Sequence, residues 1–308
     1  MAPMAGVTDS AFRRICRNLG ATCLVTEMVT AAGLSRRSIK TKSMLNYHPE
    51  EQPIGVQLFG AKPDDFARAS ALVSPLGFSF IDINAGCPVK KVMKSGSGSA
   101  LLGDIPRLLE VIRVTAENTD LPVTVKIRLG ITPENPVPLN IAELVSRAGA
   151  CALAIHGRYR SDFFGGEARK EEIKRIAELS PVPVIANGDS TSVEAALRLR
   201  TETGSSGLLI GRGAWGNPWI FRGIAGGEPG PMPGELHSTI MLQLSMMMET
   251  IPRPQVFHIF RGHLIQYFKG FAGAADFRRR AVATESLEDV DIIARDADIA
   301  CHTPTEGT

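Results

Sequence analysis

The chain has 308 residues, of which 44% are hydrophobic and 21% are charged, and its formal net charge is +2. This composition is typical of a globular protein and excludes collagen-like, coiled-coil and disordered chains. The near-neutral charge means that only local charge clusters, not the overall field, could select a partner. No apolar run approaches the roughly 18 residues of a membrane span, and no charged-then-apolar leader precedes the predicted fold.

The five cysteines are odd in number, scattered, and never spaced as a CxxC pair. This pattern argues against a disulfide framework or a zinc finger and favours reduced thiols in a cytoplasm. We therefore expect a soluble cytoplasmic protein. The length favours an enzyme with one large domain and one small domain.

Short apolar runs rich in β-branched residues alternate with stretches of helical periodicity along the first two thirds of the chain. The strand candidates are Ala2–Ala5, Cys23–Glu27, Ile54–Phe59, Phe80–Asn84, Val123–Arg128, Ala152–His156, Val182–Asn187 and Gly207–Gly211. The helix candidates between them include Asp9–Leu19, Pro63–Val73, Ile105–Glu117, Leu139–Ala148, Lys170–Leu179 and Ser192–Arg200. Eight strand–helix units close naturally into a barrel, so the predicted fold class is α/β, a (β/α)8 TIM barrel.

The segment Gly223–Gly234 holds five Gly and three Pro, too many for a regular element, and is interpreted as a linker. Beyond it, Glu235–Ala300 shows helical periodicity without strand runs, which predicts a small helical domain. The predicted organisation is a barrel at 1–222, a linker at 223–234 and a helical domain at 235–308, whose end at 303–308 is expected to be frayed.

Each predicted strand brings polar or permissive residues to its carboxyl end, where barrel enzymes place their chemistry. In strand order these are Pro3 and Met4, Glu27, Gln57, Asn84–Pro88, Lys126 and Arg128, His156–Arg158, Asn187–Asp189 and Gly211–Gly213. Core packing does not require this pattern, so it favours a functional rim.

The last two predicted strands are followed by glycines, at positions where backbone N–H groups often bind phosphate. Gly188 and Gly211 would permit close approach of the backbone, and the Arg212 guanidinium suits bidentate phosphate contact. Each feature alone is an ordinary glycine turn or surface arginine. Their joint placement favours a phosphate site.

Lys126 lies inside an apolar run, so its aliphatic stem is expected to be buried, and a buried lysine needs a negative partner or a task. It could be a Schiff-base nucleophile, a cation beside an anionic cofactor or intermediate, or the ion-pair partner of a neighbouring acid such as Asp82. His156 could be a general base, a hydrogen-bond donor to a cofactor, or a histidine at the rim whose hydrogen bonds are all made within the protein.

Cys87 is flanked by turn residues rather than by a core pattern, and a thiol can act as a proton donor or as a nucleophile. The loop that follows has no acid between residues 84 and 102, and it carries Lys90, Lys91 and Lys94. Such a cationic loop would suit a polyanion, and a solvated surface loop is the alternative.

These residues fall within motifs through which the chain resembles the tRNA-dihydrouridine synthases, most closely their bacterial type-B subgroup. The motifs are Ala2–Asp9 (APMAGVTD), Asp82–Lys91 (DINAGCPVKK), Gly98–Leu102 (GSALL), Val123–Arg128 (VTVKIR), Ile155–Arg158 (IHGR), Gly166–Ala168 (GEA), Pro183–Asp189 (PVIANGD), Ile210–Gly213 (IGRG) and Pro218–Phe221 (PWIF). The resemblance is in register from residue 2 to about 225 and looser to about 280.

The resemblance implies an FMN-bearing (β/α)8 barrel followed by a helical domain that helps to hold tRNA. It further implies that NADPH reduces the flavin, that hydride passes to C6 of a target uridine, and that Cys87 protonates C5 to give 5,6-dihydrouridine. The target base would be flipped out of the tRNA fold to reach the flavin.

The resemblance also implies site residues, with no metal, no membrane and no obligate protein partner. The implied cofactor-binding residues are Pro3, Met4, Ala5, Gln57, Lys126, His156, Asn187, Gly188, Asp189, Gly211 and Arg212. The implied substrate-binding residues are Asn84, Lys90, Lys91, Arg128 and Arg158. The basic residues between 253 and 280 would add phosphate contacts.

The chain departs from the family pattern at its start, at Lys94–Gly98, at Leu129–Ile131, and at His258 and Gly262 of the helical domain. Three other functions are compatible with the residues. They are a Schiff-base aldolase that uses Lys126, a non-catalytic RNA-binding homologue, and a flavin oxidoreductase that acts on a free pyrimidine.

Overall fold

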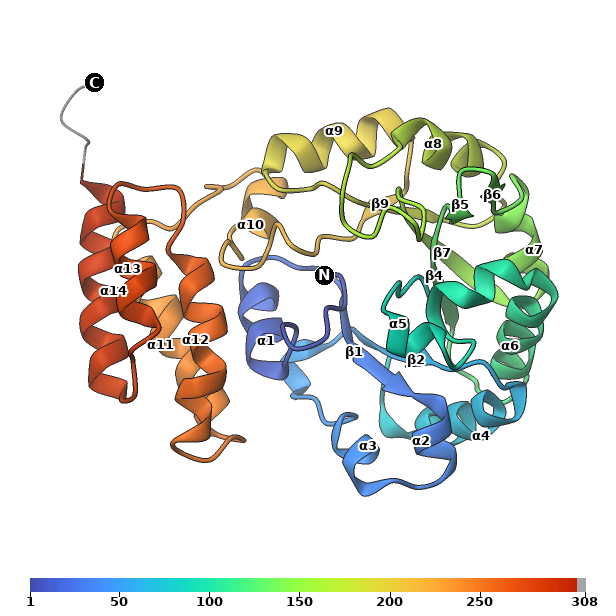
Figure 1. Ribbon diagram of the computed structural model, residues 1–308, viewed down its shortest axis with the longest axis horizontal. Coiled ribbons are helices and arrows are strands. Elements are labelled where there is room, and N and C mark those ends of the chain that lie inside the picture. Colours follow the sequence, from blue (N-terminus) through green and yellow to red (C-terminus); the bar gives the residue numbers. More distant parts are fainter. Residues whose placement is uncertain (304–308) are drawn as a thin grey trace. The chain divides into compact units, whose positions relative to one another are not determined.

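The computed structural model describes residues 1–303, so all but the first residue of the tail that was expected to be frayed lies outside the described part. The chain forms two compact units (Figure 1). Met1–Gly6 and Thr22–Gly211 make up the sheet unit, and Val7–Ala21 and Arg212–Thr308 make up the helical unit. The chain therefore passes between the units after Gly6, after Ala21 and after Gly211.

A curled sheet of seven parallel strands is the core of the sheet unit, with strand order β1-β2-β3-β4-β7-β8-β9. The strands are β1 (Leu24–Thr30), β2 (Ile54–Phe59), β3 (Phe80–Ala85), β4 (Val123–Arg128), β7 (Ala150–His156), β8 (Val184–Asn187) and β9 (Gly207–Leu208). Their apolar runs are buried because helices cover the outer face of the sheet (Figure 1). The strands predicted at 54–59 and 123–128 are confirmed residue for residue.

The first four residues lie between the two edges of this sheet. The nitrogen of Met1 donates to the Cys23 carbonyl at 2.6 Å, next to β1, and the N–H of Ala2 donates to the Ile210 carbonyl at 2.7 Å, beyond β9. The predicted strand at 2–5 is nevertheless wrong, because Pro3 lacks a donor and a turn follows at residue 5, so no ladder extends. One hydrogen bond to each edge thus closes the curled sheet.

The helices of the sheet unit follow their strands as the alternating pattern predicts. They are α2 (Ala31–Ser35), α3 (Ile39–Ser43), α4 (Pro63–Val73), α5 (Lys90–Met93), α6 (Ile105–Glu117), α7 (Ile141–Arg147), α8 (Lys170–Glu178) and α9 (Val193–Thr203). Local signals set the starts that the sequence predicted: α4 begins on a proline, and the Asp104 side chain caps α6 by accepting from the Arg107 N–H at 3.0 Å.

A two-stranded hairpin, β5 (Gly130–Thr132) and β6 (Asn135–Pro136), was not predicted. Gly130 has a φ of +139°, and a Cβ there would lie 2.6 Å from the Asn135 carbonyl oxygen. Two strands this short leave almost no periodic signal in the sequence, so the pattern could not indicate them.

The helical unit packs six helices around an apolar core. They are α1 (Ser10–Asn18), α10 (Ile220–Ile224), α11 (Glu235–Met248), α12 (Gln255–Tyr267), α13 (Ala274–Ala281) and α14 (Leu287–His302). Trp219, Phe260 and Phe268 are almost fully buried there, and Ile15 of α1 belongs to the same cluster. Helical periodicity predicted α1 but not its partner, because an apolar face does not say what covers it. None of the helices in the described part of the chain is long and apolar enough to cross a membrane.

Candidate active site at the carboxyl ends of the strands

Three neighbouring strands carry a chain of buried polar side chains. Gln57 on β2 donates to Asp82 on β3 at 2.6 Å, and Thr124 on β4 donates to the other Asp82 oxygen at 2.6 Å. The parallel register places these three side by side, with Gln57 opposite Asp82 and Asp82 opposite Thr124. Burial raises the pKa of Asp82, although these hydrogen bonds and the charge of Lys126 favour its ionised form.

Asn84 extends this chain towards the predicted catalytic cysteine. Its amide donates to the Gln57 side-chain oxygen at 2.7 Å, and its own oxygen accepts from the N–H groups of Gly86 at 3.2 Å and Cys87 at 3.0 Å. A side chain that accepts from the next residues of its own backbone fixes a turn. Asn84 therefore sets the position of the Cys87 backbone.

The loop after Cys87 folds back onto it. The Cys87 carbonyl accepts from both the N–H and the hydroxyl of Ser99, at 3.0 and 2.9 Å. Gly98 has a φ of +61°, and a Cβ there would lie 2.8 Å from that carbonyl oxygen. The glycine in the Gly98–Leu102 motif is thus needed for close backbone approach. The Cys87 side chain is itself half-buried.

Lys126 projects from β4 opposite Asn84, and it is the unpartnered cation of this site. Its side chain is partly exposed and makes no hydrogen bond or ion pair with any of residues 1–303. The sequence allowed an ion pair with Asp82, but the two Asp82 oxygens accept from Gln57 and Thr124 instead. Burial and the nearby Arg128 guanidinium lower the pKa of Lys126 to about 8, against the opposing effects of Asp82 and Cys87.

Arg128, at the end of β4, is buried and joins two loops. Its guanidinium donates to the Gly86 carbonyl at 2.9 Å and to the Tyr159 carbonyl at 3.0 Å, and it lies 5.5 Å from the ring centre of Phe164. Hydrogen bonds of this kind tie the cysteine loop to the loop that follows β7. Arg128 was predicted to bind substrate, and the structure gives it these backbone contacts.

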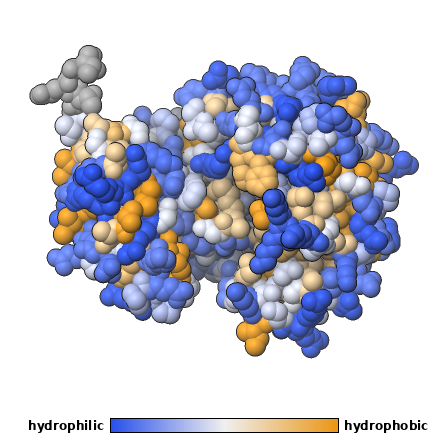
Figure 2. Space-filling model, viewed as in Figure 1, coloured by the Kyte–Doolittle hydropathy of each residue, from blue (hydrophilic) through white to orange (hydrophobic). Residues whose placement is uncertain are grey.

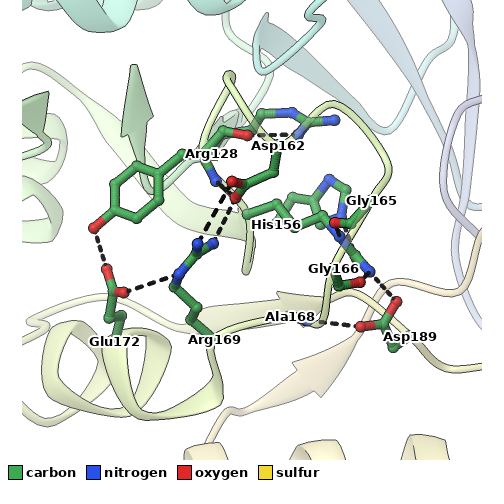
Figure 3. A network of polar contacts seen from close by, with 11 residues as sticks. Arg128, His156, Asp162, Gly165, Gly166, Ala168, Arg169, Glu172 and Asp189 are labelled. Carbon is green, nitrogen blue, oxygen red and sulfur yellow. Dashed lines mark hydrogen bonds and ion pairs between the residues drawn. The ribbon is translucent and has the colours of Figure 1, made fainter. Parts of the chain in front are cut away.

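A second network joins Arg158 to two other predicted site residues, His156 and Asp189, which are both labelled in Figure 3. Its guanidinium, 2% exposed, donates to Asp189 at 2.6 Å, to the Gly165 and Gly166 carbonyls at 2.9 and 2.6 Å, and faces His156 Nε2 at 3.3 Å. Arginine only donates, so this contact makes His156 Nε2 an acceptor and puts the ring proton on Nδ1. The second Asp189 oxygen accepts from the Ala168 N–H at 2.6 Å.

The loop between β7 and α8 is held by a further set of polar contacts that the sequence did not predict (Figure 3). Asp162 accepts from the Tyr159 N–H at 2.8 Å and pairs with Arg169, while the Tyr159 hydroxyl donates to Glu172 at 2.5 Å. The Arg169 contact lowers the pKa of Asp162, against burial, and burial with the Glu172 contact raises the pKa of Tyr159 to about 12.

This loop also presents two exposed aromatic side chains at its tip. Phe163 and Phe164 are 45% and 50% exposed, and their rings meet edge to face at 5.8 Å. Phe163 has a φ of +54°, unusual for a bulky residue. The adjacent aromatics were the one signal in the sequence that could have drawn attention to this tip.

The other predicted site residues lie at the carboxyl ends of further strands or on loops. Asn187 donates to the Leu209 carbonyl at 2.6 Å, Gly188 has a φ of +138°, and a Cβ on Gly211 would lie 3.5 Å from Met4 Sδ. Pro3 and Met4 are partly exposed and Ala5 is exposed, and Lys90 and Lys91 are exposed on α5. Arg212 belongs to the helical unit.

Comparison with known proteins identifies the family. The model of the Dihydrouridine synthase (Dus) family matches residues 1–301. The chain belongs to this family. It is 40% identical to tRNA-dihydrouridine synthase B of Pseudomonas aeruginosa over 298 residues, covering 94% of this chain and 89% of the relative. It is 37% identical to tRNA-dihydrouridine synthase B of Yersinia pestis, covering 94% and 92%. The family resemblance expected from the motifs is confirmed.

Solved structures place this dihydrouridine synthase family member among α/β barrels. An old yellow enzyme homologue from Zymomonas mobilis superposes with a TM-score of 0.51 at 13% identity, over 75% of this chain and 86% of that one. Histamine dehydrogenase from Rhizobium sp. 4-9 gives a TM-score of 0.51 at 15% identity, over 77% and 46%. Together with the curled parallel sheet, this likeness confirms the predicted fold class.

Proposed function

We propose that this protein reduces uridines in tRNA to 5,6-dihydrouridine, with FMN as cofactor and NADPH as reductant. The observation that carries the proposal is the fixed Cys87 beside the unpartnered cation of Lys126, in a chain that belongs to the dihydrouridine synthase family. Its relatives from Pseudomonas aeruginosa and Yersinia pestis are named as tRNA-dihydrouridine synthases, which supports tRNA as the substrate.

The residues of the rim fit a planar, anionic cofactor such as reduced FMN. Lys126 has a cationic side chain that makes no hydrogen bond or ion pair with any of residues 1–303, and burial and the nearby Arg128 lower its pKa to about 8. Reduced flavin carries negative charge at its N1–C2 edge, so Lys126 would face that edge. Pro3, Met4 and Ala5, which precede the first crossing of the chain, would then border the ring system.

The remaining cofactor residues divide by chemistry. Gln57 and His156 would contact the polar edge of the ring through side chains whose positions Asp82 and Arg158 fix. Asn187, Gly188, Gly211 and Arg212 would hold the ribityl chain and the phosphate. Both Asp189 oxygens already accept hydrogen bonds, so its part in this proposal is to hold the loop that carries Gly188.

When bound and reduced by NADPH, FMN supplies hydride to C6 of the uracil. The Cys87 thiol donates its proton to C5, so that one hydride and one proton saturate the C5–C6 double bond. The Asn84 turn holds the Cys87 backbone, and the Arg128 bond to Gly86 fixes the residue before it. A proton donor that is positioned before substrate binds loses little entropy in the reaction.

The substrate residues predicted from the resemblance act at two levels in this proposal. Asn84, which accepts from the Cys87 N–H, would contact the base, and the exposed Lys90 and Lys91 would contact tRNA phosphates. Arg128 and Arg158 are buried among backbone carbonyls, so they would shape the base pocket through the loops that they hold.

A Schiff-base aldolase is the competing function, and one observation favours it. A lysine whose pKa falls to about 8 holds more neutral amine near neutral pH, which nucleophilic attack on a carbonyl requires. This function gives no role to the fixed Cys87 or to the loop after it, which carries Lys90, Lys91 and Lys94 and is termed the lysine loop.

The visible absorbance spectrum of the purified protein, taken before and after anaerobic NADPH, separates the two. A flavin band that bleaches on reduction supports the synthase. A colourless protein that FMN cannot reconstitute, and that borohydride traps on Lys126 with a carbonyl compound, overturns it.

The role of Cys87 has its own test in tRNA. The variant Cys87→Ala should keep bound FMN and NADPH oxidation but lose most dihydrouridine formation on an unmodified tRNA transcript. The matched control is Cys151→Ala. It removes an exposed thiol near the start of β7, whereas the site lies at the carboxyl ends of the strands. Undiminished product from Cys87→Ala would remove Cys87 from the mechanism.

A further inference from the structure

The turn between α2 and α3, together with α3 itself, carries a cluster of cations without acidic partners. Arg36, Arg37, Lys40 and Lys42 are all exposed, and none makes a side-chain hydrogen bond or ion pair with any of residues 1–303. The nearest acids along the chain are Glu27 and Glu50. We term residues 36–42 the basic segment.

Several helical cations elsewhere on the sheet unit are each paired with an acid of their own helix. Arg107 pairs with Glu110, Arg113 with Glu117, and Arg147 with Glu143, each within its own helix at 2.7 to 3.5 Å. The cations of the basic segment, by contrast, make no ion pair with any of residues 1–303, so they produce a local positive potential.

The basic segment is held rigidly although its cations face solvent. Leu34 and Thr41 are buried, and Ser38 begins α3 by accepting from the Thr41 N–H. Arg37 has a φ of +56°, a conformation that costs free energy at a residue other than glycine. Ile39 is 87% exposed between the cations. A fixed row of cations with an apolar side chain among them suits a polyanion that also offers apolar surface.

The start of α2, the helix that precedes the basic segment, lies near the loop that follows Cys87. Helix α2 starts directly after β1, and Ala31 at its start lies 3.4 Å from the Cβ position of Gly60, beyond β2. Ala61 in turn lies 3.3 Å from the Cβ position of Gly96, in the lysine loop after Cys87. Over the part of the surface where Figure 1 places α2 and α3, Figure 2 shows hydrophilic side chains mixed with pale ones and a hydrophobic patch at the lower edge.

We propose that the basic segment is a second RNA-backbone site, in which Arg36, Lys40 and Lys42 contact consecutive tRNA phosphates and Ile39 packs against an adjacent ribose or base. Phosphate contacts fix the register of an RNA without reading its sequence, so the basic segment would help to position the tRNA body while the lysine loop holds the region of the target base. The inference rests on the proposed function, because it takes tRNA as the ligand.

The test is the salt dependence of tRNA binding by the full-length flavoprotein. The variant carries Arg36→Gln, Lys40→Gln and Lys42→Gln; Arg37 is kept because its backbone conformation shapes the segment. Each lost phosphate contact lowers the slope of log K against log salt by about 0.7 to 0.9. Three lost contacts predict a slope lower by about 2 to 3, so between 50 and 200 mM salt the wild type should lose about 20- to 40-fold more affinity than the variant.

The matched control carries Arg107→Gln, Arg113→Gln and Arg147→Gln, which remove the same charge from exposed but locally paired positions. It should keep the wild-type slope. FMN content and the thermal midpoint report whether each variant folds. Dihydrouridine formation at saturating tRNA should be unchanged in the triple variant, because the basic segment lies outside the reacting groups.

The outcomes separate this inference from the proposed function. A wild type that makes dihydrouridine while the triple variant keeps its salt slope, or loses no more than the control, overturns the second site alone. A wild type that neither binds nor reduces tRNA overturns both. A triple variant that loses binding to phosphatidylserine vesicles but keeps its tRNA affinity assigns the basic segment to a membrane surface and also overturns the second site.

Discussion

Replacement of Arg158 by alanine should destabilise the sheet unit. The change leaves the Gly165 and Gly166 carbonyls and the Asp189 carboxylate without their shared donor. Breaking one side of a buried ion pair costs about 3–5 kcal/mol. Asp189 is 35% exposed and recovers part of that from water, so we expect a loss of about 2–4 kcal/mol. In a domain of this size, that lowers the thermal midpoint by about 4 to 16 °C.

The assay is urea unfolding followed by circular dichroism, with Arg147→Ala as the matched control. Arg147 pairs with Glu143 at 3.5 Å and is 77% exposed, so its removal should cost less than about 0.5 kcal/mol. Arg158→Lys keeps the charge but not the planar fork, and it should fall between wild type and alanine. If Arg158→Ala unfolds within about 0.5 kcal/mol of the control, the network of Figure 3 does not hold the loop, and the reasoning is refuted.

Three further predictions concern neighbouring positions. Lys126→Met should be more stable than wild type at pH 7. The difference in free energy of unfolding should shrink as pH rises from 8 to 10.5, because the folded wild type releases a proton over this range that the unfolded chain keeps. Urea unfolding midpoints of both proteins across this pH range measure the difference. Gly188→Ala should lower the free energy of unfolding by about 1–3 kcal/mol, because φ is +138° and the new Cβ meets Ala168 Cβ at 2.7 Å. Adding Ala168→Gly removes the clash but not the strain in φ, so it should restore only part of the thermal midpoint. Thr124→Val should remove a donor from buried Asp82, raise the pKa of that carboxyl further, and cost about 1–3 kcal/mol of stability. The loss should grow once the pH exceeds the raised pKa of Asp82 in the folded wild type, and urea midpoints that show the same loss at every pH would contradict this.

The elements that the sequence predicted best are those whose signals are local. Helices α4 and α6 carry a proline or a capping aspartate at their starts, and β2 and β4 are short runs rich in apolar and β-branched residues. Their bounds therefore needed no knowledge of the rest of the chain. The segment at 2–5 looked like a strand because its residues are apolar. Whether it forms a ladder depended on donors and on two distant edges, which periodicity does not report.

The site likewise has features that could be predicted from the sequence and features that could not. The predicted strand ends brought Asn84, Cys87, Lys126 and His156 to one rim. In the structure, Asn84, Lys126 and His156 lie in the second halves of β3, β4 and β7, and Cys87 follows β3. The hydrogen-bond partners of Arg128 and Arg158 could not be predicted from the sequence. Both guanidinium groups donate to backbone carbonyls, and every residue type has a backbone carbonyl, so no residue type marks the acceptor. The ion pair with Asp82, one of the alternatives for Lys126, is not formed, because the Asp82 oxygens accept from Gln57 and Thr124.

The three crossings of the chain between its units bear on how the protein can be cut. A protease that nicks the chain between Gly211 and Arg212 would sever only one of three connections. The C-terminal fragment would still be held through α1, whose Phe12 and Ile15 are buried in the helical unit. The two fragments should therefore co-purify, and expression of residues 1–211 alone would leave the apolar face of α1 bare and prone to aggregation. An independently folding sheet unit would require α1 to be excised or redesigned, not merely a stop after Gly211.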